Sequence, residues 1–341
     1  MKKYILFCIL LVLAQKAFSQ EPKDTIFFTN GSTLIGEIKQ IKLGVVEFDP
    51  DDANDVTVQL RHLKTLSAAS KIFRIETITN QAYYGKLAPY SKNNYVQLIT
   101  GSDTTVLFLE DISVMYPFEK SFVQRFSGNL GFGYSYTRSS GFGRLNYDGR
   151  LRYVSQKKEL NLTFSGIYTI ADTSFSRDNE NISLLMNNYF SPTSFTTVLG
   201  NYQRNIELGL ERRFQEGFGV GNKFVTSKHV YAWARGGLVL NQEKNTENVT
   251  SGTLTELFGQ VQFNLFKFTK PEINFDLTES FYYSLSESGR FRNDGETNLK
   301  WEIIEDLYLT LNLYTNYDSK PAGIESGNFD YGLTFGVSYS F

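Results

Sequence analysis

Long segments in which apolar and polar side chains alternate at every second position dominate the chain from residue 125 to its end. In residues 307–318, for example, four leucines alternate with threonine, asparagine and aspartate. A β-strand turns successive side chains to opposite faces, so each segment has one apolar and one polar face. Strands of soluble sandwiches average about 5–6 residues, whereas these segments have the length that a tilted strand needs to cross a bilayer. The pattern predicts an all-β fold, a transmembrane antiparallel up-and-down β-barrel over residues 125–341.

Twelve such segments follow one another, and the segment 206–225 has a candidate break at Gln215-Glu216. The predicted strands are 125–138, 142–155, 158–171, 179–190, 194–204, 206–225, 228–243, 252–268, 271–285, 290–304, 306–318 and 327–341. Bacterial barrels have even strand numbers with both chain ends in the periplasm. We therefore expect everything before the barrel in the periplasm, and polar outward-facing loops at 171–180, 243–252 and 318–327.

The last predicted strand has an aromatic and aliphatic face that reaches the final residue of the sequence. The members of this face are Tyr331, Leu333, Phe335, Val337, Tyr339 and Phe341. The pattern resembles the C-terminal signal by which the barrel-assembly machinery of Gram-negative outer membranes recognises its clients. We expect that machinery as a partner during assembly, and outer-membrane lipid as the surroundings of the finished barrel.

The polar strand faces carry charges of both signs, which point into the barrel if the apolar faces meet lipid. The candidate lumen-lining residues are Arg144, Asp148, Arg150, Arg152, Glu207, Glu211, Arg213, Asp276, Lys300 and Glu302. Such charges either pair into a network that fills the lumen or line a polar pore. A twelve-stranded barrel lies between filled small barrels and open porins, so the strand count does not choose between the two.

Residues 1–20 read as a cleaved secretory signal peptide. Lys2 and Lys3 precede an apolar run of ten residues, and Ala17-Phe18-Ser19 supplies a small-x-small cleavage pattern. A membrane-anchoring helix needs roughly 20 apolar residues. The only cysteine, Cys8, lies in this segment. Secretion together with a barrel predicts localisation in the cell outer membrane.

Between the signal and the barrel the chain nearly repeats itself. The segment Thr29–Ile38 returns as Thr79–Leu87, at an offset of 50 or 49 residues. We interpret residues 24–70 and 71–118 as two small β-modules that resemble SH3-like or Sm-like barrels. Sm-like barrels bind RNA, but a formal net charge of −2 without a basic stripe argues against nucleic acid.

Candidate chemistry is sparse. One Cys and two His exclude a disulfide scaffold and Cys/His zinc sites, and no pattern indicates a cofactor. Outer-membrane phospholipases use a Ser–His pair, and the barrel has one histidine, His229, with Ser227 two residues before it. Residues i and i+2 of a strand lie about 6.5–7 Å apart, too far for a direct hydrogen bond. We expect no enzyme activity, and a lipid hydrolase centred on His229 is the least favoured alternative.

Short motifs in the barrel resemble a known family. They are Tyr202–Arg213, Gly217–Gly221, Asn316–Pro321 and Asp330–Leu333. Together they are similar to the family described as salt-induced outer membrane proteins, over about residues 125–341. The resemblance implies an outer-membrane barrel and no established activity.

Two hypotheses of function remain beside the lipid hydrolase. In the first, the barrel is a passive envelope component or a narrow channel that carries periplasmic β-modules. In the second, residues 24–118 bind a periplasmic protein or an envelope polymer, and the barrel anchors them.

Overall fold

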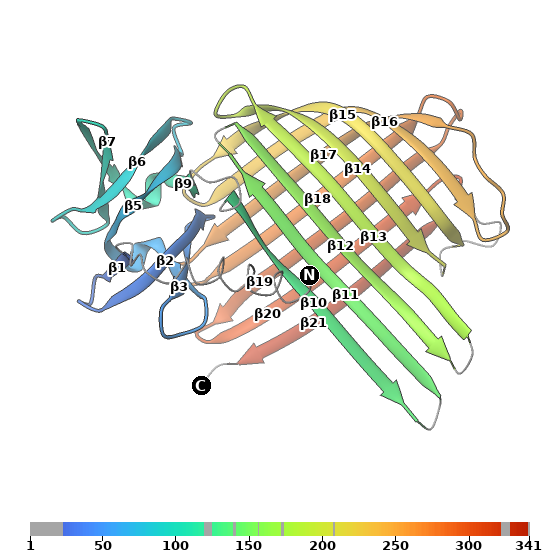
Figure 1. Cartoon of the computed structure of the whole chain (residues 1–341), viewed down its shortest axis with the longest axis horizontal. Coiled ribbons are helices and arrows are strands. Elements are labelled where there is room, and N and C mark those ends of the chain that lie inside the picture. Colours follow the sequence, from blue (N-terminus) through green and yellow to red (C-terminus); the bar gives the residue numbers. More distant parts are fainter. Residues whose placement is uncertain are drawn as a thin grey trace, which may run out of the picture.

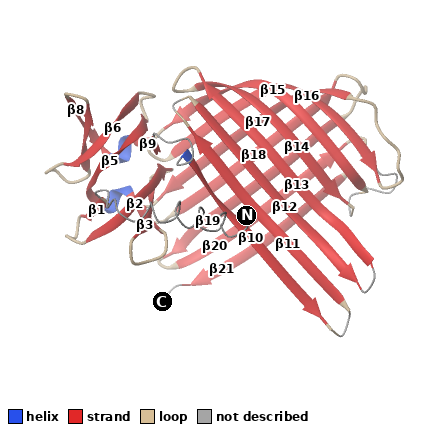
Figure 2. Cartoon of the chain, in the orientation of Figure 1, coloured by secondary structure: helices blue, strands red, loops and turns tan. Residues whose placement is uncertain are grey.

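The computed structural model describes residues 23–118, 125–138, 141–155, 157–171, 174–206, 209–321 and 328–339. The predicted signal peptide, Glu207 and Phe341 lie outside these ranges. The described residues are almost entirely β-strand and form two antiparallel sheets, which Figure 2 shows side by side. Helical structure there is confined to two single turns, η1 (Leu60–His62) and η2 (Leu109–Asp111). No helix in the described part is long and apolar enough to span a membrane.

The larger sheet has twelve strands and curls into a barrel-shaped wall, as the sequence predicts (Figure 1). Its strands are β10 (Phe126–Thr137), β11 (Phe142–Val154), β12 (Lys158–Ala171), β13 (Ser174–Tyr189), β14 (Ser194–Asn205), β15 (Leu210–Thr226), β16 (Val230–Asn245), β17 (Leu254–Lys267), β18 (Ile273–Ser284), β19 (Phe291–Ile304), β20 (Leu307–Asp318) and β21 (Phe329–Tyr339). Every strand pairs with its neighbours in sequence, so the connections are short hairpins. β15 runs through Gln215-Glu216 without a break, and β13 begins five residues before its predicted start.

The wall has an apolar outer face and a polar inner face. The strands alternate between apolar and polar side chains, and they pair so that the apolar side chains of neighbouring strands lie on the same side of the sheet. On β21, residues Tyr331, Leu333, Phe335, Val337 and Tyr339 point outward and are each about 60% exposed. The intervening Gly332 and Thr334 line a pocket on the inner face. β10 and β21 are the two edges of the sheet, and their described residues share no ladder pair.

The smaller sheet has nine strands and contains the hydrophobic core of the molecule. Its strands are β1 (Asp24–Phe28), β2 (Thr33–Lys42), β3 (Val45–Pro50), β4 (Val56–Gln59), β5 (Leu63–Thr77), β6 (Ala82–Pro89), β7 (Tyr95–Thr100), β8 (Asp103–Phe108) and β9 (Ile112–Phe118). Eighteen buried apolar side chains, among them Ile26, Phe48 and Phe73, form one cluster within it. Burial of such side chains stabilises each by roughly 1.5–3 kcal/mol, so this sheet has its own core.

The repeat seen in the sequence is also a repeat of hydrogen bonds. The ladder pair Ile26↔Leu66 of β1 and β5 recurs as Ile75↔Met115 of β5 and β9, both partners being shifted by 49 residues. The turn bonds Gly31 N–Phe28 O and Thr29 N–His62 O recur as Asn80 N–Thr77 O and Ile78 N–Asp111 O, with the same shift. The structural equivalent of Asn80 is therefore Gly31, and both have positive φ.

The two repeats share one strand. Residues 63–67 of β5 pair with β1, whereas residues 72–77 of the same strand pair with β9. The boundary expected at residues 70 and 71 therefore falls inside a continuous strand, and the division into two separate modules stays a prediction. We refer to residues 23–118 as the N-terminal sheet.

Candidate functional site

The N-terminal sheet lies against one end of the barrel, where the hairpins β15–β16 and β17–β18 turn (Figure 1). The Thr226 hydroxyl donates a 2.8 Å hydrogen bond to the Asn80 side-chain oxygen. Lys228 and Asp111 form an ion pair at 3.5 Å, and Arg61 and Glu272 form one at 3.6 Å. These contacts lie along the part of the rim formed by the two hairpins and are partly exposed. We call this end of the barrel the mouth.

A buried ion pair joins the two sheets at the centre of the mouth. The Lys223 ammonium on β15 lies 2.7 Å from a carboxylate oxygen of Glu76 on β5, and both side chains are more than nine-tenths buried. Glu76 also accepts a hydrogen bond from Arg74, its neighbour on the same face of β5. Both cations lie over the ring of Tyr189 on β13, at 4.6 Å for Lys223 and 5.1 Å for Arg74. Buried charges require such pairing to offset their loss of solvation.

A second polar cluster joins the sheets beside the first. Arg152 on β11 donates to Glu159 on β12 at 2.8 Å and to the Gln40 side-chain oxygen on β2 at 2.9 Å. Its guanidinium lies 4.1 Å from the ring centroid of Tyr116 on β9. Burial raises the pKa of Tyr116 to about 12, so its hydroxyl stays protonated at neutral pH. Residues of three strands of the N-terminal sheet therefore contact the barrel interior.

A cavity of about 340 Å³ lies between the N-terminal sheet and the barrel wall, and we call it the chamber. Its floor is formed by side chains of β2, β5 and β9, and its walls by side chains of β11 to β17. Lys42 belongs to the floor, and its burial lowers the pKa of its ammonium group. Among the described residues no hydrogen bond or ion pair joins the Lys42 ammonium group to a partner.

The opposite end of the barrel is crossed by a network of buried charges. Arg290 donates to Glu243 at 2.8 Å and to Asp318 at 2.7 Å, and Arg213 donates to Glu243 at 2.8 Å. Arg292 and Glu256 form a separate buried pair at 2.6 Å. Since β15 and β20 are not neighbours in the sheet, the 4.0 Å approach of Arg213 to Asp318 spans the lumen.

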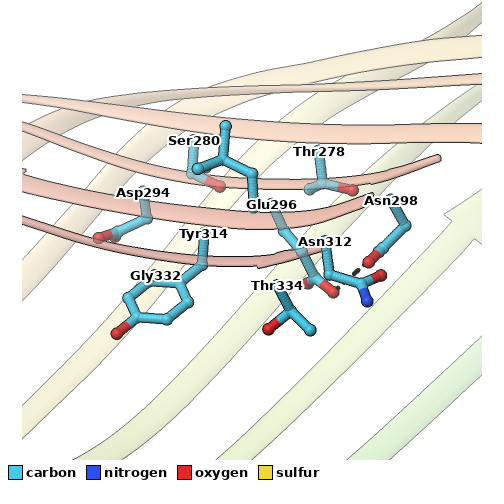
Figure 3. A pocket seen from close by; sticks show the side chains of 11 residues that line it. Thr278, Ser280, Asp294, Glu296, Asn298, Asn312, Tyr314, Gly332 and Thr334 are labelled. Atoms are coloured by element: carbon cyan, nitrogen blue, oxygen red, sulfur yellow. Dashed lines mark hydrogen bonds between the residues drawn. The ribbon is translucent and has the colours of Figure 1, made fainter. Parts of the chain in front are cut away.

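A second inner-face pocket of about 380 Å³ lies on β18 to β21 (Figure 3). Asp294, Glu296, Asn298 and Asn312 supply its polar groups, and Asn298 donates a 3.1 Å hydrogen bond to Glu296. Tyr314 lies in the same pocket, packed over Gly332 of the edge strand. This pocket is acidic, whereas the chamber is basic.

The structure brings some of the predicted lumen residues together and leaves others apart. Arg150 and Arg152 both line the chamber. Arg213 belongs to the network at the far end, Glu211 pairs with Lys244 at 2.7 Å, and Asp276 accepts a hydrogen bond from Asn264. Glu302 is buried and accepts from the backbone of Glu272. The remaining three described residues, Arg144, Asp148 and Lys300, are exposed.

Several central residues were absent from the sequence prediction. The sequence prediction missed Lys223, Glu76 and Arg74. No local sequence pattern identifies a charged residue whose partner lies in another sheet. Glu243 was expected at the start of an outward-facing loop, yet it lies within β16, two residues before the end of the strand, and is buried. Its position on the polar face of a regular strand is the signal that could have identified it.

The candidate Ser–His pair is not formed. The His229 ring nitrogen lies 3.2 Å from the carbonyl oxygen of Phe266, and the Ser227 hydroxyl bonds with the backbone of Val230. Ser227 thus stabilises the β15–β16 turn, and His229 connects that turn to β17. Within the part of the chain that the structure describes, no group of His, Cys, Asp and Glu is arranged to hold a metal ion.

A family model described as "Protein of unknown function, DUF481" matches residues 130–341. No curated protein matches the sequence. Among solved structures, "NanC porin structure in rhombohedral crystal form" is 8% identical, covers 63% of this chain and 99% of its own, and has a TM-score of 0.34. "Bacterial polysaccharide outer membrane secretin" is 10% identical, covers 80% of this chain and 97% of its own, and has a TM-score of 0.35. The crystal structure of Pseudomonas aeruginosa OccK11 (OpdR) is 8% identical, covers 93% of this chain and 83% of its own, and has a TM-score of 0.31.

Proposed function

The chain belongs to the DUF481 family of proteins of unknown function, and on this premise we propose that it is an outer-membrane β-barrel closed at its periplasmic mouth. In this proposal the N-terminal sheet acts as a plug. The protein is then a passive envelope component or a narrow channel, and it is not an open porin.

The outer face of the wall supports a location in a membrane. Large apolar side chains are exposed on strands around the whole barrel, for example Phe132 (78%), Phe218 (58%) and Phe335 (61%). Soluble proteins rarely expose apolar patches larger than a few hundred Å², whereas a transmembrane barrel needs an outward apolar band. Lipid is therefore the proposed partner of this face.

The even strand number supports the orientation. β10 begins and β21 ends at the mouth, which is also where the N-terminal sheet lies (Figure 1). Bacterial barrels have both chain ends in the periplasm. The N-terminal sheet is thus proposed to be periplasmic, and the Arg290 network then faces the cell exterior.

The buried pair of Lys223 with Glu76 carries the proposal of a plug. Removing one partner of a buried pair costs roughly 3–5 kcal/mol, because it leaves the other charge buried and uncompensated. A loosely tethered module would not bury a charge from each sheet in this way. The pair therefore favours a stable closed mouth over two modules that move freely below an anchor.

Single-channel recording in planar bilayers tests the plug. The wild-type protein should conduct weakly, and Glu76→Lys, which places three cations together, should raise the conductance severalfold by expelling the sheet. Asp51→Lys is the matched control, because it breaks an exposed ion pair with Lys23 in the same sheet away from the mouth. An Asn80→Cys and Thr226→Cys pair joined by a short bis-maleimide should restore weak conductance to the Glu76→Lys protein. A wild-type conductance equal to that of Glu76→Lys would contradict the plug.

Two finer assignments belong to the same proposal. The motifs on β14, β15, β20 and β21 support membership in the salt-induced outer membrane proteins, which predicts more protein in the outer membrane after growth in high NaCl. The hydrogen bonds repeated at 49 residues support the interpretation of the N-terminal sheet as two SH3-like units. A periplasmic protein or envelope polymer bound by that sheet remains the alternative function.

A further inference from the structure

The chamber has an excess of positive charge. It is lined by six cationic side chains and only two carboxylates. The cations are Lys42, Arg74, Arg150, Arg152, Lys223 and Arg235, and the carboxylates are those of Glu76 and Glu159. Charges of one sign that are crowded in a low-dielectric space repel one another and attract a counter-ion.

The two carboxylates are already engaged. Glu76 pairs with Arg74 and Lys223, and Glu159 pairs with Arg152. Within the described residues, Lys42, Arg150 and Arg235 therefore have no carboxylate within ion-pair distance. These three side chains, which come from β2, β11 and β16, carry three of the four excess positive charges of the chamber, and the fourth belongs to the cluster in which Arg74 and Lys223 share Glu76.

Two buried guanidinium groups also have unused donors. The Nε atoms of Arg235 and Arg74 are buried and have no hydrogen-bond partner. Arg74 is only 7% exposed, and among the described residues the Arg235 side chain makes one hydrogen bond, a long 3.4 Å contact with the Thr197 hydroxyl. Buried polar groups are normally satisfied, so these unpaired donors mark two under-satisfied cationic side chains in the wall of the chamber.

Aromatic rings line the same space. Tyr116, Tyr189, Tyr231 and Trp233 all contribute to the chamber wall, and Arg235 lies 5.2 Å from the Trp233 ring centroid. Rings give an organic ligand a flat apolar surface, and arginines recognise carboxylate or phosphate. The volume of about 340 Å³ is at the lower end for small-molecule sites and holds roughly ten waters.

We propose that the chamber is a binding site for a small organic anion, one that carries a carboxylate or phosphate group on a body the size of a monosaccharide. The anion offsets the unpaired charges of Arg235 and Lys42, while its body packs on the rings. The inference rests on the docked N-terminal sheet that the proposed function also uses, since Lys42 and Arg74 come from that sheet.

Tryptophan fluorescence can report binding directly. The chain has two tryptophans. Trp233 lines the chamber, whereas Trp301 is 41% exposed on the outer face. A Trp301→Phe protein in detergent therefore leaves one reporter, which is titrated with glucuronate, glucose 6-phosphate and uncharged glucose. We expect saturable quenching or enhancement with at least one anion and at least tenfold weaker binding of glucose. The preferred anion identifies the group as carboxylate or phosphate.

Variants on both sides of the chamber complete the test. Lys42→Gln and Arg235→Gln should each weaken anion binding at least tenfold. Lys300→Gln is the matched control, because Lys300 lies on the inner face over Tyr308 but outside the chamber, and it should bind as the parent does. Heat-modifiable gel migration verifies that each variant is folded.

Two results would overturn the proposal: no response of Trp233 to either anion at millimolar concentration, or equal binding of glucose. Failure of the plug would be seen separately, as high wild-type conductance, since the titration needs no membrane.

Discussion

Lys223 and Glu76 are 147 residues apart in the sequence and meet at 2.7 Å with both side chains buried. The pair connects two sheets that, among the described residues, share no ladder of backbone hydrogen bonds. The contact between the sheets therefore depends on side chains, and single substitutions can test it.

Replacement of Lys223 by Ala should release the N-terminal sheet from the mouth. Because the Glu76 carboxylate stays paired with Arg74, we expect the loss of one charge-assisted hydrogen bond, roughly 1.5–3 kcal/mol of docking free energy. Limited proteolysis of the linker around residues 119–124 measures the release as faster cleavage. Lys228→Ala, which removes an exposed pair with Asp111, should cost no more than about 1 kcal/mol. Equal cleavage of the two variants would speak against a central role for Lys223.

Gly44 offers a test of how closely the two sheets approach. Its φ is +74°, and an added Cβ would lie 2.8 Å from the Phe268 ring of the β17–β18 turn. Gly31 also has positive φ, but a Cβ there meets nothing within 4 Å. Both Ala substitutions carry a backbone cost of about 1–2 kcal/mol, while only Gly44→Ala also disturbs docking. Linker cleavage should therefore increase for Gly44→Ala and stay at the wild-type rate for Gly31→Ala.

The orientation can be read from epitope tags on intact cells. A tag at 174–178, the first residues of β13 at the end of the barrel away from the mouth, should be accessible to antibody without permeabilisation. A tag at 50–54, between β3 and β4, should become accessible only after the outer membrane is opened. The opposite labelling would invert the proposed topology.

The terminal strand should be needed for assembly. Replacing both Tyr339 and Phe341 by Ser removes one outward side chain of β21, that of Tyr339, and disrupts the recognition signal predicted from the sequence. Unpaired backbone groups in hydrocarbon cost several kcal/mol each, so we expect all-or-none loss of folded barrel from the outer membrane. The measurement is heat-modifiable migration. Thr334→Ser, a change on the inner face of the same strand, should leave migration unchanged.

The barrel was predictable because its strands carry their signal locally. Each strand must show an apolar face to the outside and a polar face to the inside, so the alternation in residues 307–318 is enough to recognise β20. Strand ends were less predictable. Glu243 is polar like a loop residue, but its burial comes from Arg213 and Arg290, which lie in other strands.

The chamber could not be predicted, because it depends on how two sheets meet. The repeat in residues 24–118 indicates two similar units, but no local pattern shows that β5 serves both. Likewise, no local pattern shows that Lys42 and Arg74 of the N-terminal sheet line the same cavity as Arg235 of the barrel. Such contacts between distant segments follow from docking, which a single sequence does not display.

The strand β5 has a mechanical consequence. Its residues 63–67 are bonded to β1, and further along the same strand Arg74 and Glu76 form part of the chamber floor. A force applied to the first repeat therefore reaches the mouth through hydrogen-bonded backbone and is not absorbed by a flexible linker. Tension on residues 23–60 from any envelope structure that grips them would act directly on the bond between Glu76 and Lys223.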